Sequence, residues 1–162
     1  MKKIILSVAV LAILFTGCKK KEDNPAPSTT TKTKTEYLTA HSWKISGSVS
    51  DVTIDADDNS NTPDTKDLWS QFYDACEKDD VFTFAANGTG TFTDAGTPCT
   101  PSNSQDITWT LTNNGVIVVT ILGNGSFGLT IVSIDDNTLK LSYPTQQDPN
   151  GKDFIVTETF IK

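Results

Sequence analysis

The spacing of short apolar runs between Trp43 and the C-terminus constrains the fold more than any other feature of this chain. Runs rich in β-branched and aromatic residues alternate with residues that favour turns, and no long stretch repeats apolar residues at helical spacing. The pattern therefore predicts an all-β domain. We expect eight strands, at residues 43–50, 80–86, 89–94, 105–112, 116–122, 127–134, 138–143 and 153–161.

The connections between these runs indicate the topology. Several contain residues that accept positive φ, as tight antiparallel hairpins require, at residues 87–88, 113–115, 124–126 and 135–137. Consecutive strands should therefore be neighbours in an up-and-down antiparallel meander, because no crossover helix is long enough to join parallel strands. Eight such strands can close into a barrel, which removes both exposed edges.

Alternation predicts which side chains face the interior. Ile107 and Trp109 share one face of their strand, whereas residues 116–122 and most of 127–134 are apolar on both faces. We expect one short helix at residues 67–75 to cover these two strands, because Leu68 and Phe72 fall on a single helical stripe.

The N-terminus has the pattern of a secretory signal peptide at residues 1–17. Lys2 and Lys3 precede an apolar run at residues 4–15, which is shorter than a membrane-spanning helix needs. The ending at residues 14–18 resembles the bacterial lipobox, although Phe15 departs from the usual aliphatic residue. The resemblance implies that Cys18 is acylated with chains such as palmitate and anchors the protein in a membrane. The alternative is an ordinary signal peptide beside an unmodified Cys18.

The polar segment at residues 18–35 is predicted to be a flexible tether, because it has little apolar surface to bury. Its Lys21-Glu22-Asp23 step is similar to the acidic signal that places some Gram-negative lipoproteins on the cell surface. We therefore expect an outer-membrane lipoprotein displayed at the surface, the alternative being a solvated linker that leaves it facing the periplasm.

The remaining residues 36–162 form one strongly acidic domain, with 6 Lys against 18 Asp and Glu and a formal charge of −12. The whole chain contains no Arg, so the side chains that usually bind nucleic acid are missing. We expect no nucleic-acid partner, and the sequence identifies no protein partner.

Export favours a disulfide between the two cysteines left after Cys18, namely Cys76 and Cys99. The alternatives are two free thiols or a metal site, but the CxxC spacing and a nearby His are both missing.

Two acidic clusters invite a metal interpretation, one containing Asp55 and Asp57 and the other Asp79 and Asp80. The first does not fit the EF-hand register, and solvated acidic loops are the simpler explanation for both, so we expect neither a metal nor a cofactor. The only histidine, His41, has no nucleophile motif around it, and a glycosidase carboxylate pair cannot be read from linear sequence. We therefore expect no catalytic activity.

Several short motifs follow one another along the chain: Leu38-Thr39 with Trp43-Lys44-Ile45, Asp74-Ala75-Cys76 through Asp79-Asp80, Val81-Phe82-Thr83-Phe84, Asn87-Gly88, Cys99 and Thr108-Trp109. Taken in this order, they resemble the small bacterial lipocalin-like lipoproteins. Trp43 takes the place of the lipocalin Gly-x-Trp tryptophan, without its glycine. The resemblance implies an eight-stranded antiparallel barrel, a covalent lipid anchor and, by analogy with lipocalins, a cavity for an apolar molecule.

Aromatic residues are the candidates to line that cavity. The candidates are Trp43, Phe82, Phe84, Phe92, Trp109, Phe127 and Tyr143. The alternative is a filled core, because an eight-stranded barrel has room for little more than its own side chains or one small ligand. We expect a non-catalytic binder of a small apolar or amphipathic molecule. The alternative function is an envelope adaptor that contacts a protein or glycan through its loops or outer face.

Overall fold

The computed structural model describes residues 31–55, 63–99, 104–121, 123 and 125–162. The predicted signal peptide, Cys18, most of the predicted tether and Asp57 lie outside these residues. Residues 32–162 form one compact unit that consists mostly of strands. No helix in the described part of the chain has the length and apolarity needed to cross a membrane.

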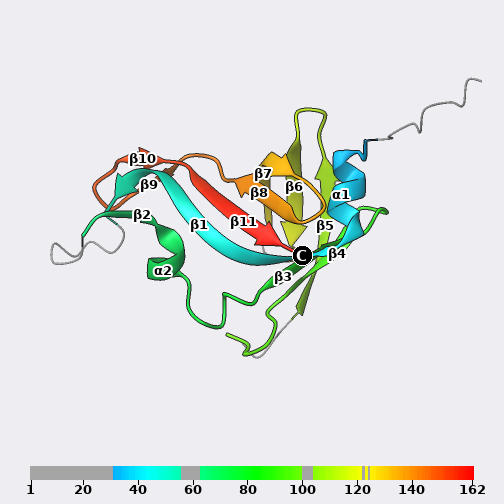
Figure 1. Ribbon diagram of the computed structural model, residues 1–162, viewed down its shortest axis with the longest axis horizontal. Helices are drawn as coiled ribbons and strands as arrows, with labels where there is room; N and C mark the ends of the chain where they lie inside the picture. The colour runs from blue at the N-terminus through cyan, green and yellow to red at the C-terminus, as the bar shows by residue number, and fades with distance from the viewer. Residues whose placement is uncertain (1–30, 56–62, 100–103, 122, 124) are drawn as a thin grey trace, which may run out of the picture. The chain divides into compact units, whose positions relative to one another are not determined.

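Eight strands form a closed antiparallel barrel, as the sequence predicted. They are β1 (Ser42–Ile54), β3 (Val81–Phe84), β4 (Thr89–Thr93), β5 (Ser104–Leu111), β6 (Val116–Ile121), β7 (Gly125–Ile134), β8 (Thr138–Ser142) and β11 (Val156–Ile161). Each pairs with the next in this order, and β11 returns to pair with β1. Figure 1 shows this closure, where the C-terminal strand runs beside the N-terminal one.

Three further strands are short. β2 (Thr65–Asp67) pairs with the far half of β1, whereas β9 (Gln146–Gln147) and β10 (Asp153–Phe154) form a separate hairpin between β8 and β11. β1 is long because it pairs with β3 at its beginning and with β2 near its end. The two ends of the barrel are therefore built differently.

Helix α1 (Lys34–Ala40) closes one end of the barrel. A capping box between Thr33 and Glu36 starts the helix. Its Leu38 is fully buried in the core, and the Leu38 carbonyl accepts a hydrogen bond from Trp43 Nε1 at 2.9 Å. The start of the chain's folded unit is thus fixed to the first barrel strand.

The helices correct two expectations. The described residues contain two short helices rather than one, and α1 begins inside the segment predicted to be a tether. The expected helix at 67–75 is shorter, α2 (Leu68–Phe72), and it packs beside β1 and β2 instead of covering the strands at 116–122 and 127–134. Figure 1 shows α2 next to the far half of β1. The predicted buried face of this helix is confirmed only in part, because Leu68 is buried while Phe72 is 48% exposed.

Candidate ligand-binding cavity

The half of the barrel next to α1 is filled with side chains. Trp43 and Phe160 are almost completely buried there, and the Phe84 and Trp109 rings meet edge to face with centroids 5.5 Å apart. A cavity of only about 50 Å³ remains among these aromatic and aliphatic side chains. This volume is close to that of one or two water molecules, so the interior here is a packed core.

The opposite end of the barrel is open. A cavity of about 360 Å³ opens there between β1, α2, β11 and the β9–β10 hairpin, and a second of about 190 Å³ lies beside the loop before β3. Tyr143 and Glu158 line both of these and the small core cavity as well. The three spaces therefore adjoin around one tyrosine and one carboxyl group.

Glu158 is buried inside the barrel, with 4% of its surface exposed. It lies on β11 between Val156 and Phe160, level with Ser48 of β1 and Leu141 of β8. The Tyr73 hydroxyl donates a hydrogen bond to Glu158 Oε1, and the Tyr143 hydroxyl lies near the same carboxyl and interacts with it. Two phenols from different parts of the chain thus hold this acid in place.

Burial sets the ionisation of these three groups. Desolvation raises the pKa of Glu158, and the hydrogen bonds from Tyr73 and Tyr143 offset only part of that rise. Desolvation, followed by the nearby Glu158 charge, also raises the pKa of both tyrosines. Both phenols therefore stay protonated at neutral pH and serve as hydrogen-bond donors.

Neighbouring residues position the Tyr73 phenol. Tyr73 directly follows α2, and its ring lies 5.0 Å from the Trp69 ring. The adjacent Ser48 side chain, 1% exposed, lies near the phenol and lines the larger cavity. Within the described residues, the Ser48 hydroxyl makes no hydrogen bond of normal distance and angle. The cavity wall thus presents a buried polar atom as well as a buried carboxyl group.

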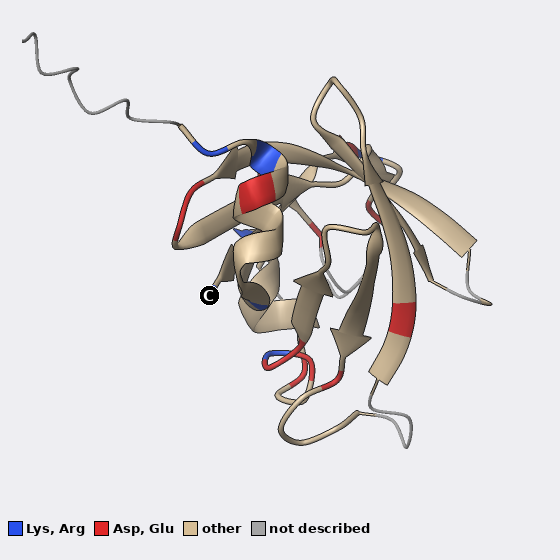
Figure 2. Ribbon diagram, turned by 90° about the vertical axis from the view of Figure 1, so that its right-hand side faces the viewer, with Lys and Arg blue, Asp and Glu red and all other residues tan. Residues whose placement is uncertain are grey.

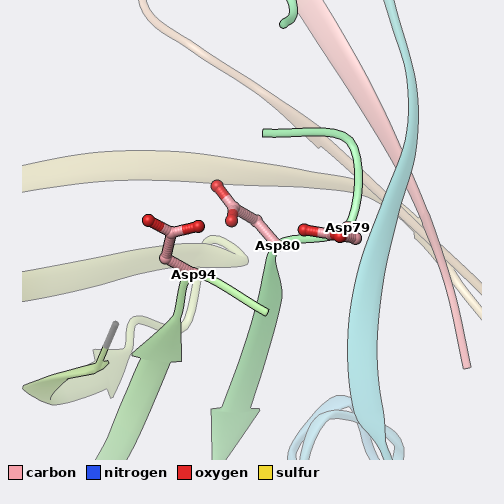
Figure 3. Close-up of side chains that lie close together, drawn as sticks. All are labelled: Asp79, Asp80 and Asp94. Atoms are coloured by element: carbon pink, nitrogen blue, oxygen red, sulfur yellow. The ribbon is translucent and has the colours of Figure 1, made fainter. Parts of the chain in front are cut away.

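An acidic cluster lies beside the second cavity. Asp79 and Asp80 precede β3 and Asp94 follows β4, and one oxygen from each of the three carboxylates lies within 4.8 Å of the others. Figure 3 shows the Asp80 and Asp94 carboxylates side by side. Desolvation, followed by the charges of Asp94, Asp79 and Glu77, raises the pKa of Asp80 to about 6.

Backbone amides and a disulfide hold this acidic loop. The Cys99 amide donates to Asp94 Oδ2 at 2.8 Å, and Cys99 forms the predicted disulfide with Cys76. Gly96 has a φ of +61°, and a Cβ atom at this position would lie 2.1 Å from Asp79 Oδ2. Only glycine fits there, both because of its backbone conformation and because the carboxylate comes so close.

The predicted cavity residues are spread over all three spaces. Tyr143 lines every one, and Phe82 lines the core cavity and the one beside the acidic loop. The core cavity also contacts Trp43, Phe84 and Phe127, whereas Phe92 lies at the cavity beside the loop. Trp109 instead packs in the core and donates its Nε1 hydrogen to the Ala85 and Thr89 carbonyls.

The acidic residues singled out in the sequence separate in space. Asp79 and Asp80 belong to the cluster described above. Its third member, Asp94, was not predicted from the sequence. Asp55 lies elsewhere and accepts a hydrogen bond from Asn150 Nδ2 at 3.3 Å.

Sequence reasoning missed the polar centre of the cavity, formed by Glu158, Tyr73 and Ser48. A signal for Glu158 was present, because it alternates with Val156 and Phe160 and so shares their inward face. Tyr73 had no such signal, since its position depends on how α2 packs against the barrel.

Comparison with known families identifies the fold. The family model of the lipocalin-like domain matches residues 40–141, more than half of the chain. The chain belongs to the lipocalin-like domain family. In this lipocalin-like chain the matched segment runs from the end of α1 to β8, and β11 beyond it closes the barrel.

Solved structures of bovine odorant-binding protein show some likeness to this lipocalin-like chain. A deswapped triple mutant has 18% sequence identity and a TM-score of 0.39, with 75% of this chain and 72% of that one covered. A complex with a selenium-containing odorant has 16% identity and a TM-score of 0.41, with 85% and 77% covered. No curated protein matches the sequence significantly.

Proposed function

We propose that this protein is a lipid-anchored lipoprotein of the cell envelope whose barrel binds a small amphipathic molecule without transforming it. The observation that carries the binding function is the cavity of about 360 Å³ at the end of the barrel away from α1. Its volume falls within the range of about 300–1,000 Å³ that is typical of small-molecule sites. The buried Glu158 carboxyl and Tyr143 hydroxyl add a few polar groups to an otherwise mostly apolar wall.

The cavity favours a small amphipathic ligand over a long apolar one. Apolar side chains such as Leu68 and Val156 can bury the body of a ligand, and Glu158 can bind a polar group. A long chain would leave part of its length in water, because this cavity opens to solvent and only about 50 Å³ is open in the α1 half of the barrel.

Binding can be tested with N-phenylnaphthylamine, a probe that fluoresces in apolar surroundings. The full-length protein in phosphatidylcholine nanodiscs should bind it saturably beyond the signal of empty nanodiscs. Val156→Trp should abolish this binding, because Val156 lines the larger cavity. Thr110→Trp, on the exposed face of β5, is the matched control and should bind normally. Absence of saturable binding would favour the adaptor function.

The anchor rests on the lipobox resemblance at residues 14–18 and needs a separate test. Cells grown with an alkyne analogue of palmitate should attach it to the protein, and Cys18→Ser should remove the label. Cys99→Ser serves as the control, because its cysteine lies in the barrel disulfide. Labelling that persists in Cys18→Ser would refute acylation at this position. Protease treatment of intact cells would then separate surface from periplasmic display.

A further inference from the structure

The Glu158 carboxyl group has unused capacity to bind a ligand. An ionised carboxylate offers about four lone-pair sites; here the Tyr73 hydroxyl donates to one of its oxygens and the Tyr143 hydroxyl lies nearby. No lysine in the described residues forms an ion pair with it; the ion pair that is present joins Lys32 to Asp136 on the exposed surface. Burial of a carboxylate without a countercharge is costly, so a cation at this position would be strongly favoured.

The other ionisable groups around the cavities make a cation the preferred partner. Besides Glu158, the ionisable groups that line the cavities of about 360 and 190 Å³ are Tyr73, Tyr143, Glu77 and Asp80. None of these groups is basic. Lys78, which follows Glu77, lies over the Trp69 ring, with Nζ 5.4 Å from the ring centroid. Two further lysines at this end, Lys66 and Lys152, donate to the backbone carbonyls of Asp51 and Thr53 and do not line the cavity. A ligand inside the cavity would therefore meet negative charge and neutral phenols.

The charge of the whole domain acts in the same direction. Residues 36–162 carry a formal charge of −12, and Figure 2 shows acidic positions gathered in the loops at the lower end of that view. Such a field raises the local concentration of cations and repels anions. A carboxylate ligand such as a fatty acid would in addition face the Glu158 carboxylate inside the cavity.

We propose that the cavity selects small organic cations, that is, amines with a short apolar body, whose ammonium group pairs with the Glu158 carboxylate. This inference rests on the proposed binding function and names its ligand class. The ammonium would supply both the missing countercharge and the missing hydrogen-bond donors. The buried Ser48 hydroxyl would accept a further hydrogen bond, and the apolar body would occupy the space beside Leu68 and Val156.

Three probes with one aromatic body separate the possible head groups: naphthylethylamine, naphthylethanol and naphthylpropionate. Their affinities are measured by isothermal titration calorimetry with the full-length protein in phosphatidylcholine nanodiscs, and empty nanodiscs are subtracted. In mildly alkaline buffer the amine should bind about tenfold more tightly than the alcohol, and the carboxylate should bind most weakly.

The variant Glu158→Gln keeps the shape of the side chain and removes its charge. It should lower the affinity for the amine by about tenfold and leave the affinity for the alcohol nearly unchanged. Asp106→Asn is the matched control, because Asp106 is exposed on β5 and its loss changes the net charge equally. That variant should retain the full preference for the amine.

A second measurement covers the case in which Glu158→Gln does not fold. Acidification of the wild-type protein should weaken amine binding relative to alcohol binding, because the carboxyl becomes protonated. Asp80 titrates nearby, so the measurement is repeated with Asp80→Asn, which should keep this pH dependence if Glu158 is responsible.

The outcomes distinguish this inference from the binding function itself. Equal affinities for the three head groups, or an amine preference that survives in Glu158→Gln, would overturn the cation inference and leave the binding function standing. Binding of N-phenylnaphthylamine without binding of the amine would overturn it in the same way. If neither N-phenylnaphthylamine nor any of the three probes binds, both proposals are wrong.

Discussion

Replacement of Asp80 by Asn should stabilise the barrel at neutral pH. The Asp80 carboxyl lies close to Asp79 and Asp94, and its Oδ1 atom is buried without a hydrogen-bond partner in the described residues. Its pKa rises from an ordinary 3.8 to about 6, first through desolvation and then through the neighbouring carboxylates. Asn has nearly the same shape, and its amide group could donate hydrogen bonds to these carboxylates.

The size of the effect follows from the pKa. At about 1.36 kcal/mol per pKa unit, the rise to about 6 corresponds to at most about 3 kcal/mol of destabilisation by the ionised form. Asp80 is partly exposed, so solvent screening reduces the expected gain to about 1 kcal/mol.

The pH dependence has a defined sign. Because the pKa is higher in the folded state than in the unfolded state, the folded state binds more protons between pH 3.8 and about 6. The contribution of Asp80 to stability is therefore lost as the pH rises through this window. The advantage of Asp80→Asn should be absent below pH 3.8 and reach its full value above about pH 6.

Urea unfolding followed by tryptophan fluorescence across this pH range tests the prediction. A chelator keeps divalent cations from neutralising the cluster, and Asp106→Asn on the exposed face of β5 controls for the change in net charge. If Asp80→Asn is no more stable than wild type at neutral pH, or if its advantage does not vary with pH, the argument from carboxylate repulsion is wrong.

Three further predictions concern the framework around the cavity. Reduction of the Cys76–Cys99 disulfide, which joins residues 23 apart, should lower the free energy of unfolding by about 3 kcal/mol; an unchanged urea midpoint with both thiols free would contradict this. Leu38→Ala should cost about 2–5 kcal/mol because the side chain is fully buried, and a loss no larger than that of Thr110→Ala on the exposed surface would show that α1 does not seal the barrel. Trp43→Phe should cost about 1–3 kcal/mol by removing the Nε1 hydrogen bond to the Leu38 carbonyl, and thermal unfolding that matches wild type would exclude that role.

The sequence by itself determined the class of fold. Turn residues such as Asn87-Gly88 fixed where strands end, and alternation as in Ile107 and Trp109 fixed which faces turn inward. Because consecutive strands are joined by tight hairpins, they were expected to form an up-and-down meander. Eight such strands can close into a barrel. The disulfide was also predicted from the sequence, because the expected acylation of Cys18 would leave Cys76 and Cys99 as a pair, and the structure contains this disulfide.

Only the tertiary structure decided which parts of the barrel are full and which are hollow. Trp43 and Phe82 look alike as inward aromatic residues, yet the first is fully buried in the core and the second also borders the cavity beside the acidic loop. Their difference depends on α1, which places Leu38 at one end of the barrel. The pattern of residues within one strand does not show how close a distant segment such as α1 will lie.

The polar centre of the cavity likewise arises from long-range contacts. Tyr73 and Glu158 are 85 residues apart, and Asp94 joins Asp79 only because β3 and β4 pair. Alternation can place Glu158 on an inward face, but the desolvation and the hydrogen bonding that set the pKa of its carboxyl depend on atoms brought together by folding. The sequence therefore specified the barrel, and the closed fold created its candidate site.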